Sequence, residues 1–585
     1  MSELKTRWTD KVDKSCPLNE YPRPQLKRED WLCLNGDWDY AITPFGEDCP
    51  DGFTDKITVP FAIESFLSGV QKTFRPDERL WYRRYFYIPE NLKDKRCIMH
   101  FEAVDWQCEI FVNRKSVGKH TGGYCPFCFD ITDYLNEKGN EVIVKVYDPT
   151  DTGWQQRGKQ VLKSKGFWYT ATSGIWQSVW LDFVNERHIT KLHMTPDIDK
   201  SRLHLECVGT GITHCKVIAR VIENEKEVFK GEIPLVGFID IENPRLWSPE
   251  DPFLYKLYLD VYKNDVLVDK VESYFGMRKF SVGKDEKGIP RLMLNNKPYF
   301  MRGLLDQGYW SDGGLTPPCD EAMIFDIQKM KDLGFNMLRK HIKMESLRWY
   351  YHCDRLGMIV WQDMMSGGDY IGDILAGVLP NLNIPVNDKH YTWFKRTEDE
   401  WREDYERELL ELIDNLYNCV SIGCWVPFNE GWGQFDAKRI AERIKEIDSS
   451  RFVDHASGWY DQKGGDFKSE HRYILPVYRP KDKKLNRPFV LSEYGGYSQI
   501  IENHVWNRQK SFGYIMFNSK EKLSKAYKKL HQKQVIPLIE KGLCATVYTQ
   551  VSDVEFEVNG MYTYDREILK LDPNVVKEVN SLLTY

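Results

Sequence analysis

The sequence lacks the features that mark membrane and nucleic-acid-binding proteins. Nowhere do about 18 apolar residues follow one another, so we expect no transmembrane helix. No dense block of basic residues occurs, and the formal net charge of −6 argues against a nucleic acid or a membrane surface as a partner. The N-terminus contains no apolar stretch of the kind found in signal peptides, which predicts a cytoplasmic protein.

Motifs for metals and cofactors are missing as well. Cys125 and Cys128 have the spacing of a zinc-ligand pair, but no second pair or histidine cluster completes a site. The 14 cysteines are scattered through apparent strands and helices, where reduced core thiols are expected. No Gly-x-Ser-x-Gly segment marks a serine hydrolase. We therefore expect neither a metal nor a cofactor.

The N-terminal half of the chain is predicted to be all β. At 585 residues the protein is too long for a single hydrophobic core. Short alternating or apolar segments, separated by turns, predict a jelly-roll β-sandwich over residues 1–185. A second set of strands over residues 186–280 has the size of an immunoglobulin-like sandwich.

From residue 281 to 585 strands alternate with helices. Eight segments of strand length are predicted, at 298–304, 335–341, 358–364, 420–430, 452–459, 473–478, 487–495 and 544–553. One helix is marked by a face at helical spacing, formed by Trp401, Tyr405, Leu409, Leu412 and Leu416. Eight alternating units of this kind predict a (β/α)8 barrel.

Two glutamates end strands of this predicted barrel. Glu430 follows the apolar run Cys424–Phe428, and Glu493 lies in the seventh strand. The ends of barrel strands meet at the face where active sites lie. Burying a carboxylate is costly unless it is paired, protonated or catalytic, so two at this face indicate catalysis.

The chain resembles glycoside hydrolase family 2, the group of β-galactosidases, β-glucuronidases and β-mannosidases. The similarity covers nearly the whole chain. The residues that carry it are 103–132 and 173–181 in the first domain, 246–255 in the second, 274–282 and 295–304 at the barrel entry, "PFNEGWG" (427–433) and "FVLSEYGG" (489–496). The resemblance implies that the first domain is a sugar-binding domain and that the substrate is a glycoside.

The resemblance also implies a retaining mechanism with two carboxyl groups. Glu430 becomes the acid/base, which must hold a proton, and Glu493 the nucleophile, which must be ionised. Asn429 is expected to bond the sugar 2-hydroxyl, Arg339 to lie beside Glu493, and Tyr478 to hydrogen-bond Glu493. Four further residues are placed at the pocket or, alternatively, in structural roles: His341, Asp363, Trp459 and His471. Tyr460 is a second candidate for a stacking wall beside Trp459.

Two departures from the family bear on the sugar. An aspartate that galactosidases and glucuronidases carry before the Gly-Ile pair is replaced by Trp168 or Tyr169. The Asn-x-Lys pair that reads a uronate carboxylate is absent, because Asn559 has no lysine two residues on, while Asn518-Ser519-Lys520 is in the wrong place. A buried uronate without a cation would bind poorly, so a neutral sugar is predicted.

The sequence predicts an exo-acting β-galactosidase first. A β-mannosidase, β-glucosidase, arabinosidase or galactofuranosidase remains open, and a β-glucuronidase is disfavoured. Outside enzymes, the alternative is a carbohydrate-binding protein, against which the two carboxylates argue. The sequence does not fix the oligomeric state, and a homo-oligomer is compatible with it.

Overall fold

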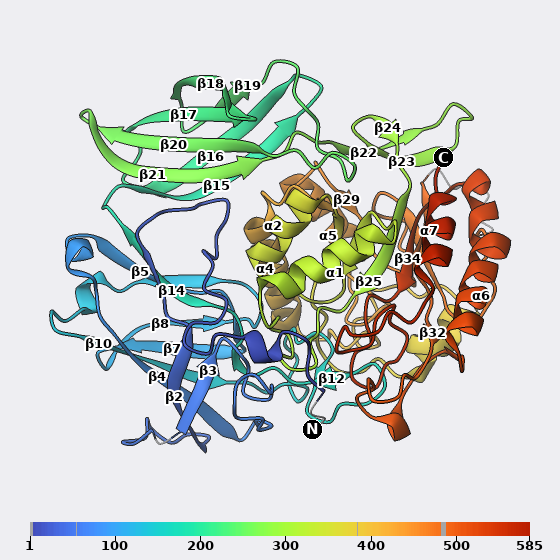
Figure 1. Ribbon diagram of the computed structural model, residues 1–585, viewed down its shortest axis with the longest axis horizontal. Helices are drawn as coiled ribbons and strands as arrows, with labels where there is room; N and C mark the ends of the chain where they lie inside the picture. The colour runs from blue at the N-terminus through green and yellow to red at the C-terminus, as the bar shows by residue number, and fades with distance from the viewer. Residues whose placement is uncertain (1–3, 54, 383, 481–486) are drawn as a thin grey trace.

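The protein consists of two β-sandwiches packed against one barrel (Figure 1). The computed structural model describes residues 4–53, 55–382, 384–480 and 487–585. In Figure 1 the first sandwich is blue, the second is green and lies above it, and the barrel runs from yellow-green to red. None of the described helices combines the length and the apolar composition that crossing a membrane requires.

The first sandwich has two antiparallel sheets around an apolar core. The smaller sheet has the order β1 (Trp31–Cys33), β14 (Val179–Val184), β5 (Arg96–Phe101) and β9 (Phe127–Asp130). The larger has the order β3 (Asp55–Val59), β2 (Gly36–Pro44), β4 (Glu78–Phe86), β10 (Asn140–Tyr147), β7 (Gln107–Val112) and β8 (Lys115–Thr121). Their alternating apolar side chains, among them Trp38, Phe101 and Val144, fill the space between the sheets.

The second sandwich is smaller and also antiparallel. One sheet contains β15 (His188–Asp197), β16 (Arg202–Thr210) and β19 (Val236–Asp240). The other contains β18 (Lys226–Ile233), β17 (Lys216–Glu223), β20 (Tyr255–Lys263) and β21 (Val266–Phe275). A small sheet of β22 (Phe280–Lys284), β23 (Pro290–Leu294) and β24 (Lys297–Pro298) leads into the barrel.

Eight parallel strands form the barrel, as predicted. They are β25 (Met301–Asp306), β26 (Met337–Lys340), β27 (Ile359–Asp363), β28 (Ile422–Val426), β29 (Phe452–Val453), β30 (Lys468–Arg472), β31 (Phe489–Gly495) and β34 (Leu543–Thr549). Every residue of β27, β28, β31 and β34 is buried. Burial on both faces explains their continuous apolar runs, since helices cover a parallel sheet from outside.

The helices around the barrel are amphipathic. The longer ones are α1 (Asp320–Asp332), α2 (Leu347–Leu356), α4 (Asp399–Leu416), α5 (Ala437–Ile447), α6 (Lys520–Leu530) and α7 (Pro573–Ser581). In α4 the predicted face is correct, because Tyr405, Leu409, Leu412 and Leu416 are buried. Its fifth member, Trp401, stacks on Trp154 of the first sandwich with ring centroids 6.1 Å apart.

The sixth strand differs from its prediction. The segment 473–478 was expected to form it, but β30 covers Lys468–Arg472. Glu470, His471 and Arg472 make β30 a polar strand that the apolar pattern does not reveal. The apolar segment after it is instead exposed: Ile474 is 72% accessible to solvent.

Candidate active site

A cavity of about 300 Å³ opens where the barrel strands end. Residues from β25, β30, β31 and β34 line its floor, and loops from the barrel and from the first sandwich line its walls. It contains six of the residues predicted from the sequence: Asn429, Glu430, His341, Trp459, His471 and Glu493. Arg339 and Asp363 lie directly beneath, fully buried.

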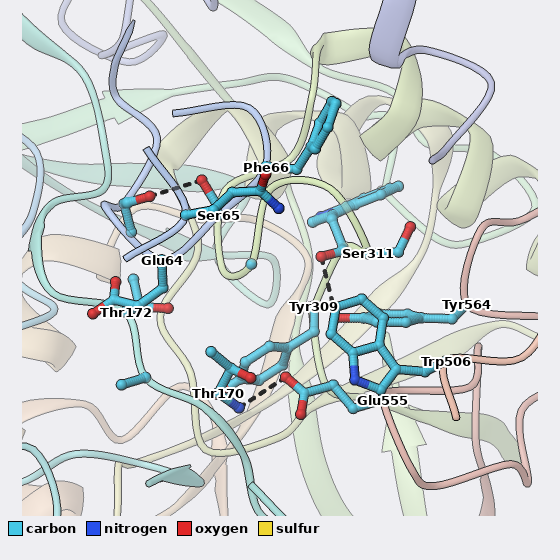
Figure 2. A pocket seen from close by; sticks show the side chains of 15 residues that line it. Glu64, Ser65, Phe66, Thr170, Thr172, Tyr309, Ser311, Trp506, Glu555 and Tyr564 are labelled. Carbon is cyan, nitrogen blue, oxygen red and sulfur yellow. Dashed lines mark hydrogen bonds between the residues drawn. The ribbon is translucent and has the colours of Figure 1, made fainter. Parts of the chain in front are cut away.

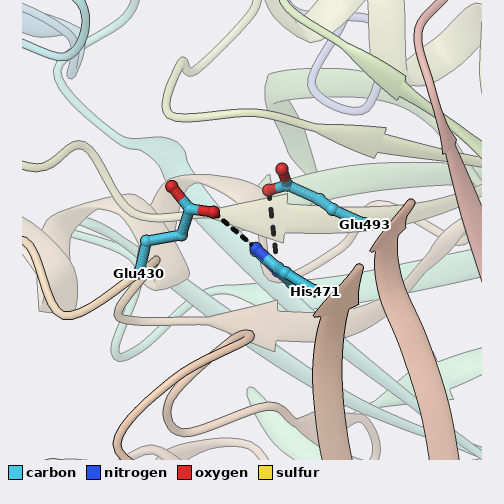
Figure 3. Close-up of side chains that lie close together, drawn as sticks. All are labelled: Glu430, His471 and Glu493. Carbon is cyan, nitrogen blue, oxygen red and sulfur yellow. Dashed lines mark hydrogen bonds and ion pairs between the residues drawn. The ribbon is translucent and has the colours of Figure 1, made fainter. Parts of the chain in front are cut away.

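The carboxyl groups of Glu430 and Glu493 face one another across this cavity (Figure 3). One carboxylate oxygen of each lies within 4.8 Å of the other and of a ring nitrogen of His471. His471 Nδ1 is 2.8 Å from Glu430 Oε1, and its Nε2 is 3.7 Å from Glu493 Oε1. The two glutamates are 63 positions apart in the sequence, and the fold of the barrel brings them close together in space.

Glu430 reaches the cavity through an unusual backbone conformation. It lies beyond the end of β28 with φ of +52°, in the left-handed region that non-glycine residues rarely adopt. Its amide donates a hydrogen bond of 3.0 Å to the carbonyl of Ser457. Gly431 follows with φ of +72°. Such strain is found where the surroundings hold a functional side chain in place.

Glu493 is held in the ionised form. Arg339 donates to its Oε1 over 3.1 Å, and the hydroxyl of Tyr473 donates to its Oε2. Burial alone would raise the pKa of Glu493, but His471, Arg339 and the hydrogen bond from Tyr473 lower it to about 2. A buried carboxylate with these partners is charged at neutral pH and suited to nucleophilic attack.

Arg339 organises the floor of the cavity. Its Nε and one terminal nitrogen each donate over 2.9 Å to Asp363, in a bidentate pair. It also donates to Oδ1 of Asn429 over 2.8 Å, which leaves the amide nitrogen of Asn429 as the donor available to a ligand. Asp363 therefore holds Arg339 and does not itself line the cavity.

His341 shares this support. Its Nδ1 lies 2.8 Å from Asp363 Oδ2, an arrangement that leaves Nε2 as the free ring nitrogen. Burial lowers the pKa of His341 well below its usual value, and the nearby cations Lys159 and Arg339 lower it further. A neutral ring suits hydrogen bonding to a hydroxyl.

The prediction for Tyr478 is wrong. Its hydroxyl accepts a hydrogen bond of 3.1 Å from Arg472, and the side chain is 40% exposed. Tyr473 holds the predicted place beside Glu493, with its ring stacked 4.1 Å from that of Tyr514. The error follows from the misplaced sixth strand, because the first residue after β30, not the end of 473–478, reaches the cavity.

The two aromatic candidates after the fifth strand have different places. Trp459 lines the cavity, with its ring 6.4 Å from that of His471. Tyr460 is buried, and its hydroxyl donates to the carbonyl of Leu375 over 2.6 Å. Tyr460 thus fastens the segment 370–382, which contains two short helices, and does not form a stacking wall.

Two charged residues from loops around the cavity, Lys159 and Glu557, were not predicted, nor was Arg472 of β30. Lys159 extends from the first sandwich and lines the cavity, where the sequence predicted no cation for a uronate carboxylate. Glu557 is buried, and its two oxygens accept hydrogen bonds from Tyr169 and from Asn559 Nδ2. An acid therefore does reach the pocket, but from the barrel. No motif marks either residue, because each comes from an irregular loop.

The residues at which the sequence departs from the family differ in whether they line the cavity. Trp168 lines the cavity, where its ring meets that of Trp432 edge-on at 4.9 Å, whereas Tyr169 is buried behind it. Lys520 begins α6 and donates to the carbonyl of Leu569 over 3.1 Å. The segment Asn518–Lys520 is thus outside the cavity lining.

A second cavity adjoins the first sandwich and contains two buried acids, Glu64 and Glu555 (Figure 2). Burial raises the pKa of Glu64 to about 8 and raises that of Glu555 above its usual value. The backbone amide of Thr170 donates to Glu555 over 2.8 Å. Groups that favour the protonated form do not supply an ionised nucleophile, so the cavity around Glu430 and Glu493 is the candidate active site.

Similarity searches link the chain to curated and solved proteins. It is 27% identical over 440 residues to a β-galactosidase of Halalkalibacterium halodurans, covering 71% of this chain and 40% of that protein. It is 25% identical over 460 residues to a putative β-glucuronidase of Formosa agariphila, covering 74% and 52%. The chain thus spans about half the length of the curated relatives it matches.

Solved structures share the architecture. A β-glucuronidase of Ruminococcus gnavus superposes with a TM-score of 0.76 at 18% identity, covering 96% of this chain and 99% of that one. Three models of the glycosyl hydrolases family 2 match most of the chain: the sugar-binding domain at 32–183, the central domain at 187–278 and the TIM barrel domain at 287–578. The chain therefore belongs to glycoside hydrolase family 2.

Proposed function

We propose that the protein is a retaining β-glycosidase that removes a neutral sugar from the non-reducing end of its substrate. The observation that carries this proposal is the pair Glu430 and Glu493, with carboxylate oxygens within 4.8 Å of one another. Retaining enzymes separate their carboxyl groups by about 5–5.5 Å, whereas inverting enzymes leave room for a water at roughly 6.5–9.5 Å. The short separation favours retention.

The proposed reaction has two displacements. Glu493 attacks the anomeric carbon while Glu430 donates its proton to the departing oxygen, which leaves as an alcohol. A covalent glycosyl-enzyme results. Glu430, now ionised, removes a proton from water, the water oxygen attacks the anomeric carbon, and Glu493 is released. Arg339 and Tyr473 hold the nucleophile, and the free amide nitrogen of Asn429 suits the sugar 2-hydroxyl.

Tyr473 provides a test through pH. Its hydrogen bond favours the ionised form of Glu493, so Tyr473→Phe should raise the pKa of that carboxyl. We expect the acidic limb of the kcat/KM profile to move to higher pH, because the nucleophile is lost as it protonates. Tyr478→Phe is the matched control, since that hydroxyl bonds Arg472. A shift caused by Tyr478→Phe, with none from Tyr473→Phe, would contradict the assignment.

A neutral sugar is supported by two charged side chains that line the cavity, Glu557 and Lys159. The buried carboxylate of Glu557 would repel a uronate but can accept hydrogen bonds from sugar hydroxyls. Lys159 can donate to such hydroxyls. Together they offset one another in charge. Several of the curated relatives are named β-galactosidase, which makes a β-galactoside the first candidate, before β-mannosides, β-glucosides, arabinosides and galactofuranosides.

A second candidate is a β-glucuronide. Lys159 favours it, because an ammonium group can bind a sugar carboxylate, and proteins of the same architecture bear the name β-glucuronidase.

Exo action is supported by the loop of the first sandwich that carries Lys159 and Trp168, since it lines one side of the cavity.

A panel of 4-nitrophenyl glycosides separates the candidates. We expect the best neutral β-glycoside to exceed the matching β-glucuronide in kcat/KM by roughly 100-fold, because the uronate meets Glu557. A glucuronide as the best substrate would contradict the neutral sugar, and Lys159→Met should then abolish that preference. Tight binding without turnover of any member would favour a carbohydrate-binding protein instead.

A further inference from the structure

The outer part of the cavity is apolar, in contrast to its charged floor. Four large side chains that line it are also strongly exposed: Phe167, Tyr370, Ile474 and Leu475. Tyr370 is 47% and Leu475 45% accessible to solvent. Several exposed apolar side chains around one cavity are typical of a site that binds a ligand.

These side chains come from three separate segments. Phe167 belongs to the loop of the first sandwich, and Ile474 and Leu475 follow β30. Tyr370 precedes the short helix η4 (Ile374–Val378), from which Ala376 also lines the cavity. Three separate segments of the chain therefore contribute to the apolar wall, and no single apolar segment forms it.

The loop that carries Tyr370 is fastened from behind. Ile371 and Leu375 are buried in the barrel core, and the hydroxyl of Tyr460 donates to the carbonyl of Leu375 over 2.6 Å. Tyr370 itself donates to Asp373 over 2.7 Å. The part of the wall that carries Tyr370 and Ala376 is thus held in place before any ligand arrives, which lowers the entropic cost of binding.

The wall lies at the open end of the cavity, toward which the leaving group of an exo-acting enzyme extends from the terminal sugar. Glu430, the proposed proton donor to the leaving group, has a side chain 30% exposed, whereas Glu493 is buried. Trp459 lies beside His471, which bonds Glu430. Glu557 and Lys159 offer the hydrogen bonds that a sugar needs, while the exposed part of the wall is aromatic or aliphatic.

We infer that the apolar wall formed by Phe167, Tyr370, Ala376, Ile474 and Leu475 binds the aglycone, and that the natural substrates carry an apolar aglycone such as an aryl, alkyl or polycyclic alcohol. This inference rests on the proposed glycosidase function. A second sugar is the disfavoured leaving group, because its hydroxyls would lose water against aliphatic side chains without gaining partners. An extended apolar alcohol instead buries its carbon atoms against the apolar side chains of the wall.

A series of alkyl β-glycosides from methyl to octyl tests the inference on the wild-type protein. The sugar is the one preferred in the nitrophenyl panel. The longer alcohols have nearly the same acidity, so kcat/KM follows binding of the chain. We expect kcat/KM to rise roughly two- to fourfold per methylene over the first several carbons, as each is buried. A flat series, or a disaccharide of the same sugar cleaved better than the octyl glycoside, would overturn the inference.

Two variants locate the effect. Leu475→Asp and Tyr370→Ser should each reduce the rise of kcat/KM with alkyl chain length. Val266→Asp should leave this rise as it is in the wild-type protein. Val266 is an exposed apolar residue of the second sandwich and serves as the matched control. An unchanged slope in both wall variants would assign the chain-length effect elsewhere. If light scattering showed a dimer that Leu475→Asp dissociates, and the series were flat, the wall would belong to a second copy.

The glycosyl fluoride of the same sugar separates this inference from the proposed function. Fluoride leaves without an aglycone, so its hydrolysis reports only the sugar site and the two carboxyl groups. Turnover of the fluoride with a flat alkyl series would refute the aglycone site and leave the glycosidase intact. No turnover of the fluoride or of any glycoside would refute the glycosidase itself.

Discussion

Replacing Glu493 by alanine is expected to lower kcat by roughly 10⁴-fold or more, since the covalent step has no other nucleophile. The variant should still fold. Arg339 loses one partner but keeps its bidentate pair with Asp363 and its bond to Asn429. Azide should restore turnover of an activated β-glycoside by entering the space left by the side chain. The product should be the α-glycosyl azide, because a single displacement inverts the anomeric carbon.

A second variant controls for this rescue. Glu493→Gln keeps the shape of the side chain and removes its charge, so we expect it to be inactive and not rescued by azide. The midpoint of thermal unfolding should be recorded for both variants, to separate loss of chemistry from loss of fold. Near-wild-type turnover by Glu493→Ala without azide would exclude this residue as the nucleophile.

Replacing Glu430 by alanine should give a loss that depends on the leaving group. For an alkyl glycoside, whose alcohol needs a proton to depart, we expect kcat/KM to fall by roughly 10³–10⁴-fold. For a 2,4-dinitrophenyl glycoside, whose phenolate leaves unaided, the first step should fall by less than about tenfold. Comparison of the two substrates on one protein preparation makes the measurement independent of enzyme concentration.

Azide distinguishes the two glutamates by stereochemistry. In the Glu430 variant Glu493 still forms the covalent intermediate, so azide attack should give the β-glycosyl azide. The Glu493 variant should give the α-anomer. Equal losses across leaving groups, or an α-azide from the Glu430 variant, would contradict the acid/base role.

The architecture was accessible from the sequence because it depends on periodicity. In the helix face of α4 and in the apolar runs of β28 and β31, the apolar residues of the sequence are the residues that are buried. Glu430 and Glu493 were accessible for the same reason, because each follows or ends an apolar strand at the functional face of a barrel. The resemblance to the family then supplied the expected roles.

Tyr473, Lys159 and Glu557 could not be predicted from the sequence, and β30 shows why for Tyr473. The buried residues of β30 are polar because they serve the cavity, so it lacks the signature of a strand, while the apolar segment after it faces solvent. Because the apolar pattern predicts the sixth strand at 473–478 in place of β30, it also predicts Tyr478 at the position that Tyr473 occupies. Lys159 and Glu557 come from loops almost 400 positions apart, and only the packing of the first sandwich on the barrel brings both to one cavity.

Trapping of the covalent intermediate tests the two-carboxylate mechanism most directly. A 2,4-dinitrophenyl 2-deoxy-2-fluoro-β-glycoside of the preferred sugar should inactivate the protein, since the fluorine slows both displacements while the reactive leaving group keeps formation of the intermediate faster than its hydrolysis. Peptide mass spectrometry should then find one sugar per chain, attached to the peptide that contains Glu493. A label on Glu430, on Glu557 or on any other carboxylate would contradict the assignment of Glu493 as the nucleophile.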